Sequence, residues 1–231
     1  MPKKVAVLQS NYIPWKGYFD IINSVDEFIF YDEVQYTKND WRNRNKIKTQ
    51  NGVQWLTIPV RQESLDQKIS EVKVSMDNWA EKHWRTLLTN YSKANAFKAY
   101  RDRFEKFYAG ITTAYLSEIN QQAIAFINSL LNIQTMITSS TAYKLSNGRN
   151  ERLLDLILQT GATEYLSGPA AKSYIDENLF NEAGVKITWM DYSGYSEYSQ
   201  LFPPFEHGVS IVDLIMNEGD NAITYLKSHR A

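Results

Sequence analysis

The chain has 231 residues, of which 43% are hydrophobic and 22% are charged, and its formal net charge is -1. This composition is that of a globular protein rather than a disordered one, and a near-neutral chain has no overall field that would gather nucleic acids. Cysteine is absent, which excludes disulfides, thiolate nucleophiles and cysteine-based zinc sites.

Hydrophobic segments are too short for export or for the membrane. The apolar run at residues 5–8 is shorter than the core of a signal peptide. No segment approaches the roughly 20 apolar residues that a membrane helix needs. Because a chain without cysteine also suits a reducing compartment, we expect a cytoplasmic protein without a membrane span.

The first third of the chain has the pattern of short buried strands. Apolar runs predict strands at residues 5–9, 27–31 and 55–60, and residues 17–24 predict a brief helix between the first two.

The middle of the chain has the pattern of amphipathic helices. Trp84, Leu87, Leu88 and Tyr91 follow the spacing of one helix face. A second stripe of this kind follows at Leu116, Ile119, Ala123, Ile127 and Leu130.

The last third alternates strands and helices. A strand is predicted at residues 133–138, followed by a helix with Asn150 as N-cap and Gly161 just beyond its end. Further short strands are predicted at residues 165–166 and 185–190.

A final helix is predicted from its cap residues. Ser210 at the N-cap and Asp213 at the third helical position are close to a capping box, and Gly219 ends the helix. We therefore assign this motif to structure first.

Strands separated by helices require crossover connections and predict a mostly parallel sheet. We expect an α/β fold of Rossmann-like type, in which residues 1–231 form a single domain with a helical insert at about residues 75–130.

The segment after the first strand is the first candidate for a binding site. Ligands of open parallel sheets bind beyond the carboxyl ends of the strands. The amides of Gln9 and Asn11 would read hydrogen-bonding edges there, and Tyr12 or Trp15 would stack on a ring. The structural alternative is a Pro–Gly turn with aromatic packing.

A second candidate follows the next strand. Asp32 and Gln35 precede a basic run, and acidic residues followed by basic ones can hold a magnesium–phosphate group or a nucleotide sugar. The alternative is a solvated edge strand, on which cations discourage aggregation. The basic residues are Lys38, Arg42, Arg44, Lys46 and Lys48. Alternation of the last four would put them on one side of an extended segment.

Two further positions have chemical potential. His83 is a candidate general base, or alternatively a packed helix histidine. Ser167 and Gly168 follow a predicted strand and would present backbone N–H groups to a phosphate or carboxylate, or form a simple turn. No pair of histidines has metal-ligand spacing, so no metal site is predicted, and the cofactor is left open.

Together these segments resemble the WbqC-like protein family. The likeness spans nearly the whole chain and includes Asn43-Arg44. In the position of residue 8 the family typically has His, where this chain has Leu8. The other matching segments are Gln9 to Phe19, Asp32 to Gln35, Ile47-Lys48, Trp55 to Val60, the helix of His83, Tyr165 to Gly168, Ser210 to Leu214 and Asn217 to Gly219.

The resemblance implies a role in bacterial O-antigen or other surface-polysaccharide biosynthesis, and a glycine transferase activity is attributed to some members. It also points by analogy to the nucleotidyl-transferase branch of α/β folds. Our leading hypothesis is acyl or aminoacyl transfer, including glycyl transfer, onto a nucleotide-linked amino sugar, with His83 or Asp32 as base. Phosphate contacts would come from Arg44, Lys46 and Lys48.

Two alternatives stay open beside this hypothesis. One is a non-catalytic nucleotide-sugar binding protein of the same pathway. The other is single-stranded nucleic-acid binding through Tyr36 and Trp41, which the near-zero net charge and the lack of an RNA-binding signature oppose. The expected partner is a small molecule, not a nucleic acid.

Overall fold

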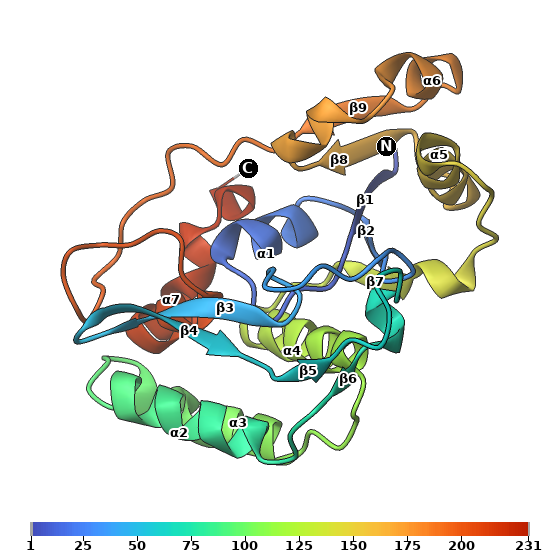
Figure 1. Ribbon diagram of the computed structural model, residues 1–231. Coiled ribbons are helices and arrows are strands. Elements are labelled where there is room, and N and C mark those ends of the chain that lie inside the picture. Colours follow the sequence, from blue (N-terminus) through green and yellow to red (C-terminus); the bar gives the residue numbers. More distant parts are fainter. Residues whose placement is uncertain (1, 231) are drawn as a thin grey trace.

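A five-stranded parallel sheet forms the centre of the computed structural model, which describes residues 2–230 (Figure 1). The strand order is β7-β2-β1-β8-β9, and every neighbouring pair is parallel. The chain runs from β1 outward to β2 and β7, and then returns to the other side of β1 for β8 and β9. The strands are β1 (Lys4–Leu8), β2 (Glu27–Phe30), β7 (Met136–Ser139), β8 (Glu164–Ser167) and β9 (Lys186–Trp189).

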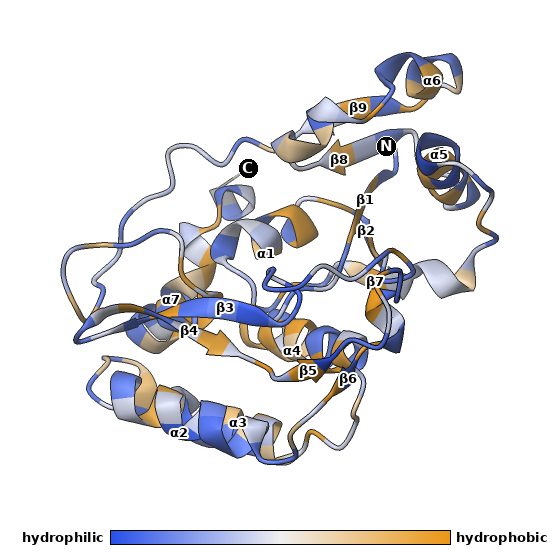
Figure 2. Ribbon diagram, in the orientation of Figure 1, coloured by the Kyte–Doolittle hydropathy of each residue, from blue (hydrophilic) through white to orange (hydrophobic). Residues whose placement is uncertain are grey.

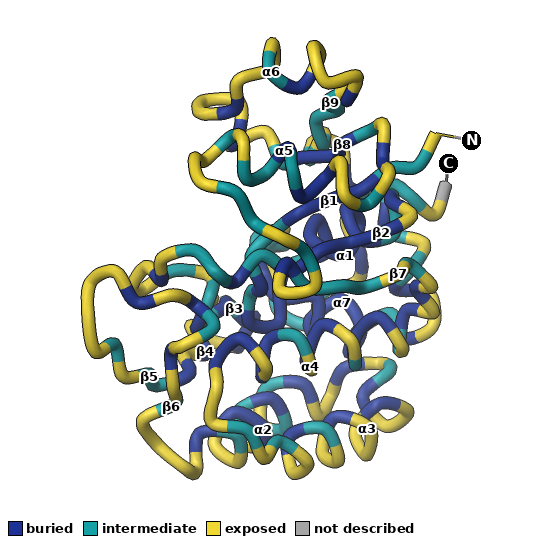
Figure 3. The backbone as a smooth tube through the Cα atoms, turned by 90° about the vertical axis from the view of Figure 1, so that its right-hand side faces the viewer, coloured by how far each residue is buried: buried dark blue, intermediate teal, exposed yellow. Residues whose placement is uncertain are grey.

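Hydrophobic residues on both sides of β1 explain its central place. Ala6 belongs to one buried cluster, whereas Val5 and Val7 belong to another, because successive side chains of a strand point to opposite faces. Strands buried on both faces read as continuous apolar runs, as these do. Figure 3 shows the resulting dark band of buried backbone through β1 and β2.

Seven α-helices surround the sheet among the described residues. The first cluster packs α1, α4 and α7 against one face, with α2 and α3 beyond them, and the second packs α5 and α6 against the other. In Figures 1 and 3, α6 and the α2–α3 pair lie at opposite ends of the molecule. The helices are α1 (Lys16–Asn23), α2 (Trp79–Tyr91), α3 (Phe97–Ala109), α4 (Leu116–Leu130), α5 (Arg149–Gln159), α6 (Glu177–Glu182) and α7 (Ile211–Glu218).

Two short antiparallel ribbons complete the fold. The larger joins β3 (Arg44–Thr49) to β4 (Gly52–Thr57), and Gly52 at its turn has a φ of 95° that favours glycine. Figure 2 shows that β3 is strongly hydrophilic, unlike the strands of the central sheet. The smaller ribbon pairs β5 (Val60–Arg61) with β6 (Lys73–Val74), and the 3-10 helices are η1 (Ile69–Glu71), η2 (Ser140–Ala142), η3 (Pro169–Ser173), η4 (Gly219–Tyr225) and η5 (Lys227–Arg230).

The mixed α/β fold with a mostly parallel sheet is confirmed. Three of the helices lie within residues 75–130, but the division into a body and a helical insert stays a prediction. The strand predicted at residues 55–60 is wrong in its extent, because β4 ends at Thr57 and β5 begins at Val60.

Of the two predicted helix N-caps, one is wrong and the other is confirmed without its capping box. The N-cap of α5 is Gly148 rather than Asn150, whose side chain instead donates to the Tyr174 carbonyl and accepts from the Asp176 amide. Ser210 does cap α7 through its hydroxyl, but Asp213 does not complete a capping box, since buried tyrosines hydrogen-bond to its carboxylate.

Candidate functional site

A cleft of about 690 Å³ opens where the strand order reverses, between the carboxyl ends of β1 and β8. Open α/β sheets bind their ligands at this topological position. We call it the switch-point cleft. Its walls combine apolar and polar side chains from the ends of β1, β2 and β8, from the segment before β3 and from α5 and η3, with Leu8, Gln9, Tyr31, Gln35, Asp40, Arg42, Arg149, Asn150, Tyr165, Ser167, Gly168 and Tyr174 among them.

Two amides from the loop after β1 hold a guanidinium in this cleft. Arg42 donates from Nη1 to Oδ1 of Asn11 at 2.7 Å and from Nη2 to Oε1 of Gln9 at 3.1 Å. Among the described residues, the one carboxylate that forms an ion pair with it is that of Asp40, 3.8 Å away. Because neutral amides orient a cation without neutralising it, this amide–arginine bridge (Gln9, Asn11, Arg42) presents a fixed positive charge.

The loop that carries the two amides is strained. Ile13 has a φ of 36°, an unusual value for a β-branched residue that costs on the order of 1–3 kcal/mol. Asn45 of β3 compensates by donating to the carbonyls of both Tyr12 and Ile13 at 3.1 Å. The Tyr12 amide also donates to the Trp41 carbonyl at 3.0 Å, so the loop is tied to the segment that carries Arg42.

The opposite wall carries a second cation. Arg149 lies in the first turn of α5, and its guanidinium carbon is 3.8 Å from the centre of the exposed Tyr174 ring. The N-cap of α5 is Gly148, which has no side chain to form a cap, and the acidic Glu151 lies in the first turn of the same helix. Ser167 and Gly168 continue the wall where β8 meets η3.

His83 lies outside the lining of the cleft. Its Nδ1 atom is 2.8 Å from the Tyr12 hydroxyl, which in turn is 2.9 Å from the Tyr108 hydroxyl, and its Nε2 atom is 3.1 Å from the Thr57 carbonyl. Burial lowers the pKa of His83 to about 4, so the imidazole is neutral at pH 7. In this tyrosine–histidine cluster (Tyr12, His83, Tyr108) all three side chains are buried, and both ring nitrogens already have partners.

Asp32 is likewise buried and fully engaged. Its carboxylate accepts from the Ser10 amide at 2.8 Å, the Ser117 hydroxyl at 2.5 Å and the Gln121 amide at 3.0 Å. These bonds fasten the end of β2 to the loop after β1 and to α4. A catalytic role for Asp32 or His83 stays a prediction, and the geometry assigns both a structural function.

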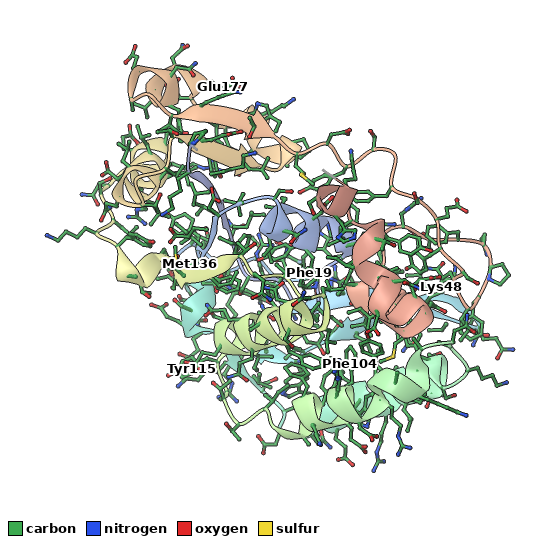
Figure 4. The ribbon with its side chains drawn as sticks, turned by 180° about the vertical axis from the view of Figure 1, so that it is seen from behind. Phe19, Lys48, Phe104, Tyr115, Met136 and Glu177 are labelled. Carbon is green, nitrogen blue, oxygen red and sulfur yellow. The ribbon has the colours of Figure 1, made fainter. Side chains whose placement is uncertain are left out.

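The predicted phosphate-binding cations lie on the β3–β4 ribbon. The Arg44 guanidinium and the Lys46 ammonium are 4.2 and 5.3 Å from the centre of the Trp55 ring. Lys48 is buried beside α7 and donates to the Pro204 carbonyl (Figure 4). The extended backbone predicted for this segment is confirmed, but these three cations are not among the cleft residues.

The other predicted binding residues divide between the cleft and the interior. Gln9, Gln35, Ser167 and Gly168 meet in the cleft, although Gln35 also donates to the Leu65 carbonyl. Asn43 is buried and donates to the Ile58 carbonyl at 2.9 Å. Tyr12 is buried in the tyrosine–histidine cluster.

The sequence predicts Arg42 only as one of five basic residues, and it predicts neither Arg149 nor Tyr174 as a binding residue. Arg42 stood within the basic run, and nothing in the pattern separated it from Arg44. Arg149 is next to the predicted cap Asn150, and Tyr174 lies shortly after Gly168 in the sequence. Only the folded arrangement of α5 and the end of β8 brings Arg149 and Tyr174 to the same cleft as the loop after β1.

Within residues 2–230 there is neither a cluster of metal ligands nor a helix that could span a membrane. Among residues 2–230, no group of three or more His, Asp or Glu side chains could hold a metal ion. In the same residues, no helix has both the length and the apolar character needed to cross a bilayer.

Comparison with known proteins supports the resemblance seen in the motifs. A curated relative, the uncharacterized protein Rv1507c of Mycobacterium tuberculosis, is 49% identical over 226 residues, which cover 97% of this chain and 98% of the relative. No solved structure gives a significant match. The sequence profile of the WbqC-like protein family matches residues 9–225, and the chain therefore belongs to this family.

Proposed function

We propose that this protein binds a nucleotide-linked sugar in the switch-point cleft and acts in bacterial surface-polysaccharide biosynthesis. The observation that carries the proposal is the Arg42 guanidinium, which two neutral amides orient within the cleft. A fixed guanidinium is a preferred partner for the paired anionic oxygens of a diphosphate. Arg149 on the opposite wall supplies a second positive charge.

The size and walls of the cleft fit such a ligand. Its volume of about 690 Å³ falls within the usual range for small-molecule sites, about 300–1,000 Å³. Tyr31 and Tyr174 offer aromatic surface for a base, and Gln9 offers an amide for hydroxyl groups or base edges.

The reaction that we propose is transfer of an acyl or aminoacyl group, including glycyl, to the amine of the bound sugar. The amine nitrogen bonds to the acyl carbonyl carbon, the bond from that carbon to the donor's leaving group breaks, and the amine gives up a proton. Asp40 lines the cleft beside Arg42, and its carboxylate accepts from the Thr37 hydroxyl and from the amide of Trp41, a residue of the adjoining pocket, at 2.7 Å each. Because Asp40 is only partly buried and keeps further lone pairs, we assign its carboxylate as the proton acceptor. His83 and Asp32 remain the bases that the sequence predicts.

A second candidate, a nucleotide-sugar binding protein without turnover, is favoured by the engaged positions of His83 and Asp32. Incubation with a uridine-diphosphate amino sugar and an activated acyl donor, followed by mass spectrometry, separates the two. A sugar nucleotide heavier by the acyl group supports the transferase, and its loss in Asp40→Asn supports the assigned base. Binding without a product supports the second candidate.

The proposal is tested by a thermal-shift screen against nucleotides, nucleotide sugars and activated acyl donors, with and without magnesium. A ligand at 100 times its dissociation constant stabilises the folded state by about 2.7 kcal/mol. We expect a shift with a sugar nucleotide in the wild type and in Arg44→Ala, and none in Arg42→Ala. A flat response to every nucleotide sugar, or an equal shift in Arg42→Ala, would contradict the proposal.

A further inference from the structure

A second, smaller pocket adjoins the amide–arginine bridge. It has a volume of about 310 Å³ and is lined by Asn11, Pro14, Trp15, Trp41, Asn45 and Gly208. Asn11 belongs to this lining, whereas Gln9 and Arg42 line the switch-point cleft. The bridge therefore forms the boundary between the two hollows.

The aromatic walls of this pocket are supported from behind. The Trp15 ring contacts the rings of Tyr192 and Tyr195 at centroid distances of 5.0 and 5.8 Å. The Trp41 ring packs on Trp55 at 5.3 Å, and 42% of Trp41 remains exposed. Both indoles are thus held in place without a ligand, and a preformed wall lowers the entropy cost of binding.

The polar groups of the pocket have different roles. Asn45 uses its amide nitrogen on the Tyr12 and Ile13 carbonyls and its oxygen on the Lys46 amide, so it only shapes the wall. The Asn11 oxygen accepts from Arg42, which orients the carboxamide and leaves its amino group to donate to a ligand. Tryptophan walls with one oriented amide suit a ring that has an apolar face and hydroxyl edges.

We infer that the Trp15–Trp41 pocket binds the pyranose ring of the substrate. The C–H face of the sugar would pack on the indoles, and a hydroxyl or acylamino oxygen would accept from Asn11. This inference rests on the proposed function, because a diphosphate bound at Arg42 would place its attached sugar at the adjoining pocket. The pocket volume is at the lower end of the range for small-molecule sites, which suits one sugar ring rather than a whole nucleotide.

The test uses free sugars, so that it does not depend on nucleotide binding. Saturation-transfer NMR is recorded with methyl glycosides of glucose, galactose and N-acetylglucosamine on the wild type, Trp41→Ala, Trp41→Phe and Tyr115→Ala. Tyr115, labelled in Figure 4, is an exposed ring that stacks with Lys73 but does not line the pocket, so it is the matched control. Thermal melts confirm that each variant is folded.

We expect transfer to the sugar ring protons in the wild type, Trp41→Phe and Tyr115→Ala, and its loss in Trp41→Ala. Absence of transfer from the wild type to all three glycosides, or undiminished transfer in Trp41→Ala, would overturn the inference. If glycosides bind at Trp41 while the nucleotide screen stays flat, the proposed nucleotide sugar is wrong and the sugar pocket stands. If nucleotide sugars bind but the glycosides show no transfer, the proposed function stands and the sugar pocket is wrong.

Discussion

The amide–arginine bridge and the tyrosine–histidine cluster both take residues from the loop after β1, yet their surroundings differ. Gln9 and Asn11 face hollows, and they hold a cation whose nearest ion-pair partner is 3.8 Å away. Tyr12, the residue after Asn11, is fully buried against His83. One group presents charge to a ligand, while the other satisfies its polar atoms within the protein.

This difference shows that residue type alone does not identify a site. Histidine and aspartate are common catalytic groups, but the side chains of His83 and Asp32 are buried and hydrogen-bonded to other groups of the protein. Arginine and glutamine are less diagnostic in a sequence, yet here they line the open cleft.

The largest effect is expected for His83→Ala. Removing this buried ring leaves a cavity and takes partners from the Tyr12 hydroxyl and the Thr57 carbonyl, so the free energy of unfolding should fall by about 3–4 kcal/mol. Urea denaturation measures the loss. Lys82→Ala, on the exposed side of α2, is the matched control and should change stability by less than about 0.5 kcal/mol. Equal stability of the two variants would contradict the structural role.

The pH dependence of stability should carry the signature of His83. Its pKa is lowered from 6.5 to about 4 by burial, so between these values the unfolded chain binds a proton that the folded chain does not. Stability from this group is therefore complete above pH 6.5 and is lost as the pH falls toward 4, by on the order of 3 kcal/mol. Urea titrations of the wild type and His83→Gln across this range isolate the difference. Parallel pH profiles would contradict it.

Asp32→Asn should have the next largest effect. The amide would place a donor among three donors and lose the charge that strengthens their hydrogen bonds, which costs about 2 kcal/mol. Asp26→Asn is a fair comparison, because Asp26 also accepts a backbone amide but is exposed. If Asp32→Asn instead keeps its stability and loses only turnover, the catalytic prediction from the sequence is restored.

The smallest effect is expected for Tyr174→Ala. Loss of the ring frees Arg149 from its stacked position and removes aromatic surface from the cleft, so affinity for a nucleotide sugar should fall about fivefold, or about 1 kcal/mol. Isothermal titration calorimetry measures the change. Tyr174→Phe keeps the ring and should bind like the wild type, and a loss of affinity in that variant would point to the hydroxyl instead.

The sheet could be predicted from the sequence because its strands are short apolar runs. The elements β1, β2 and β8 were found within one or two residues, and Gly161 was found just beyond α5 because its φ of 72° favours glycine. The alternating cations of β3 predict an extended segment, but its partner strand and its bounds depend on pairing with β4. The local pattern predicts Asn150 as a cap. The pattern cannot show that its side chain instead contacts residues 174 and 176, because these lie far from it in the sequence.

The candidate site could be predicted only in part. The topology rule predicts a site at the loop after β1, and the strand-to-helix turn separately predicts Ser167–Gly168; the fold brings both segments to one cleft. The rule could not separate Arg42 from Arg44, since that choice depends on how the segment before β3 meets the loop. The Trp15–Trp41 pocket joins residues from two loops, and local pattern alone does not show that they meet.

Hydrogen–deuterium exchange with and without ligand tests the central claim most directly, that the open cleft binds the substrate and the His83 cluster does not. Exchange is followed in a millimolar mixture of uridine-, guanosine- and thymidine-diphosphate sugars. We predict slower exchange at residues 8–11, 149–154 and 167–174, with α2 unchanged. Protection centred on α2 around His83, with the cleft segments unchanged, would contradict the account, as would no protection anywhere.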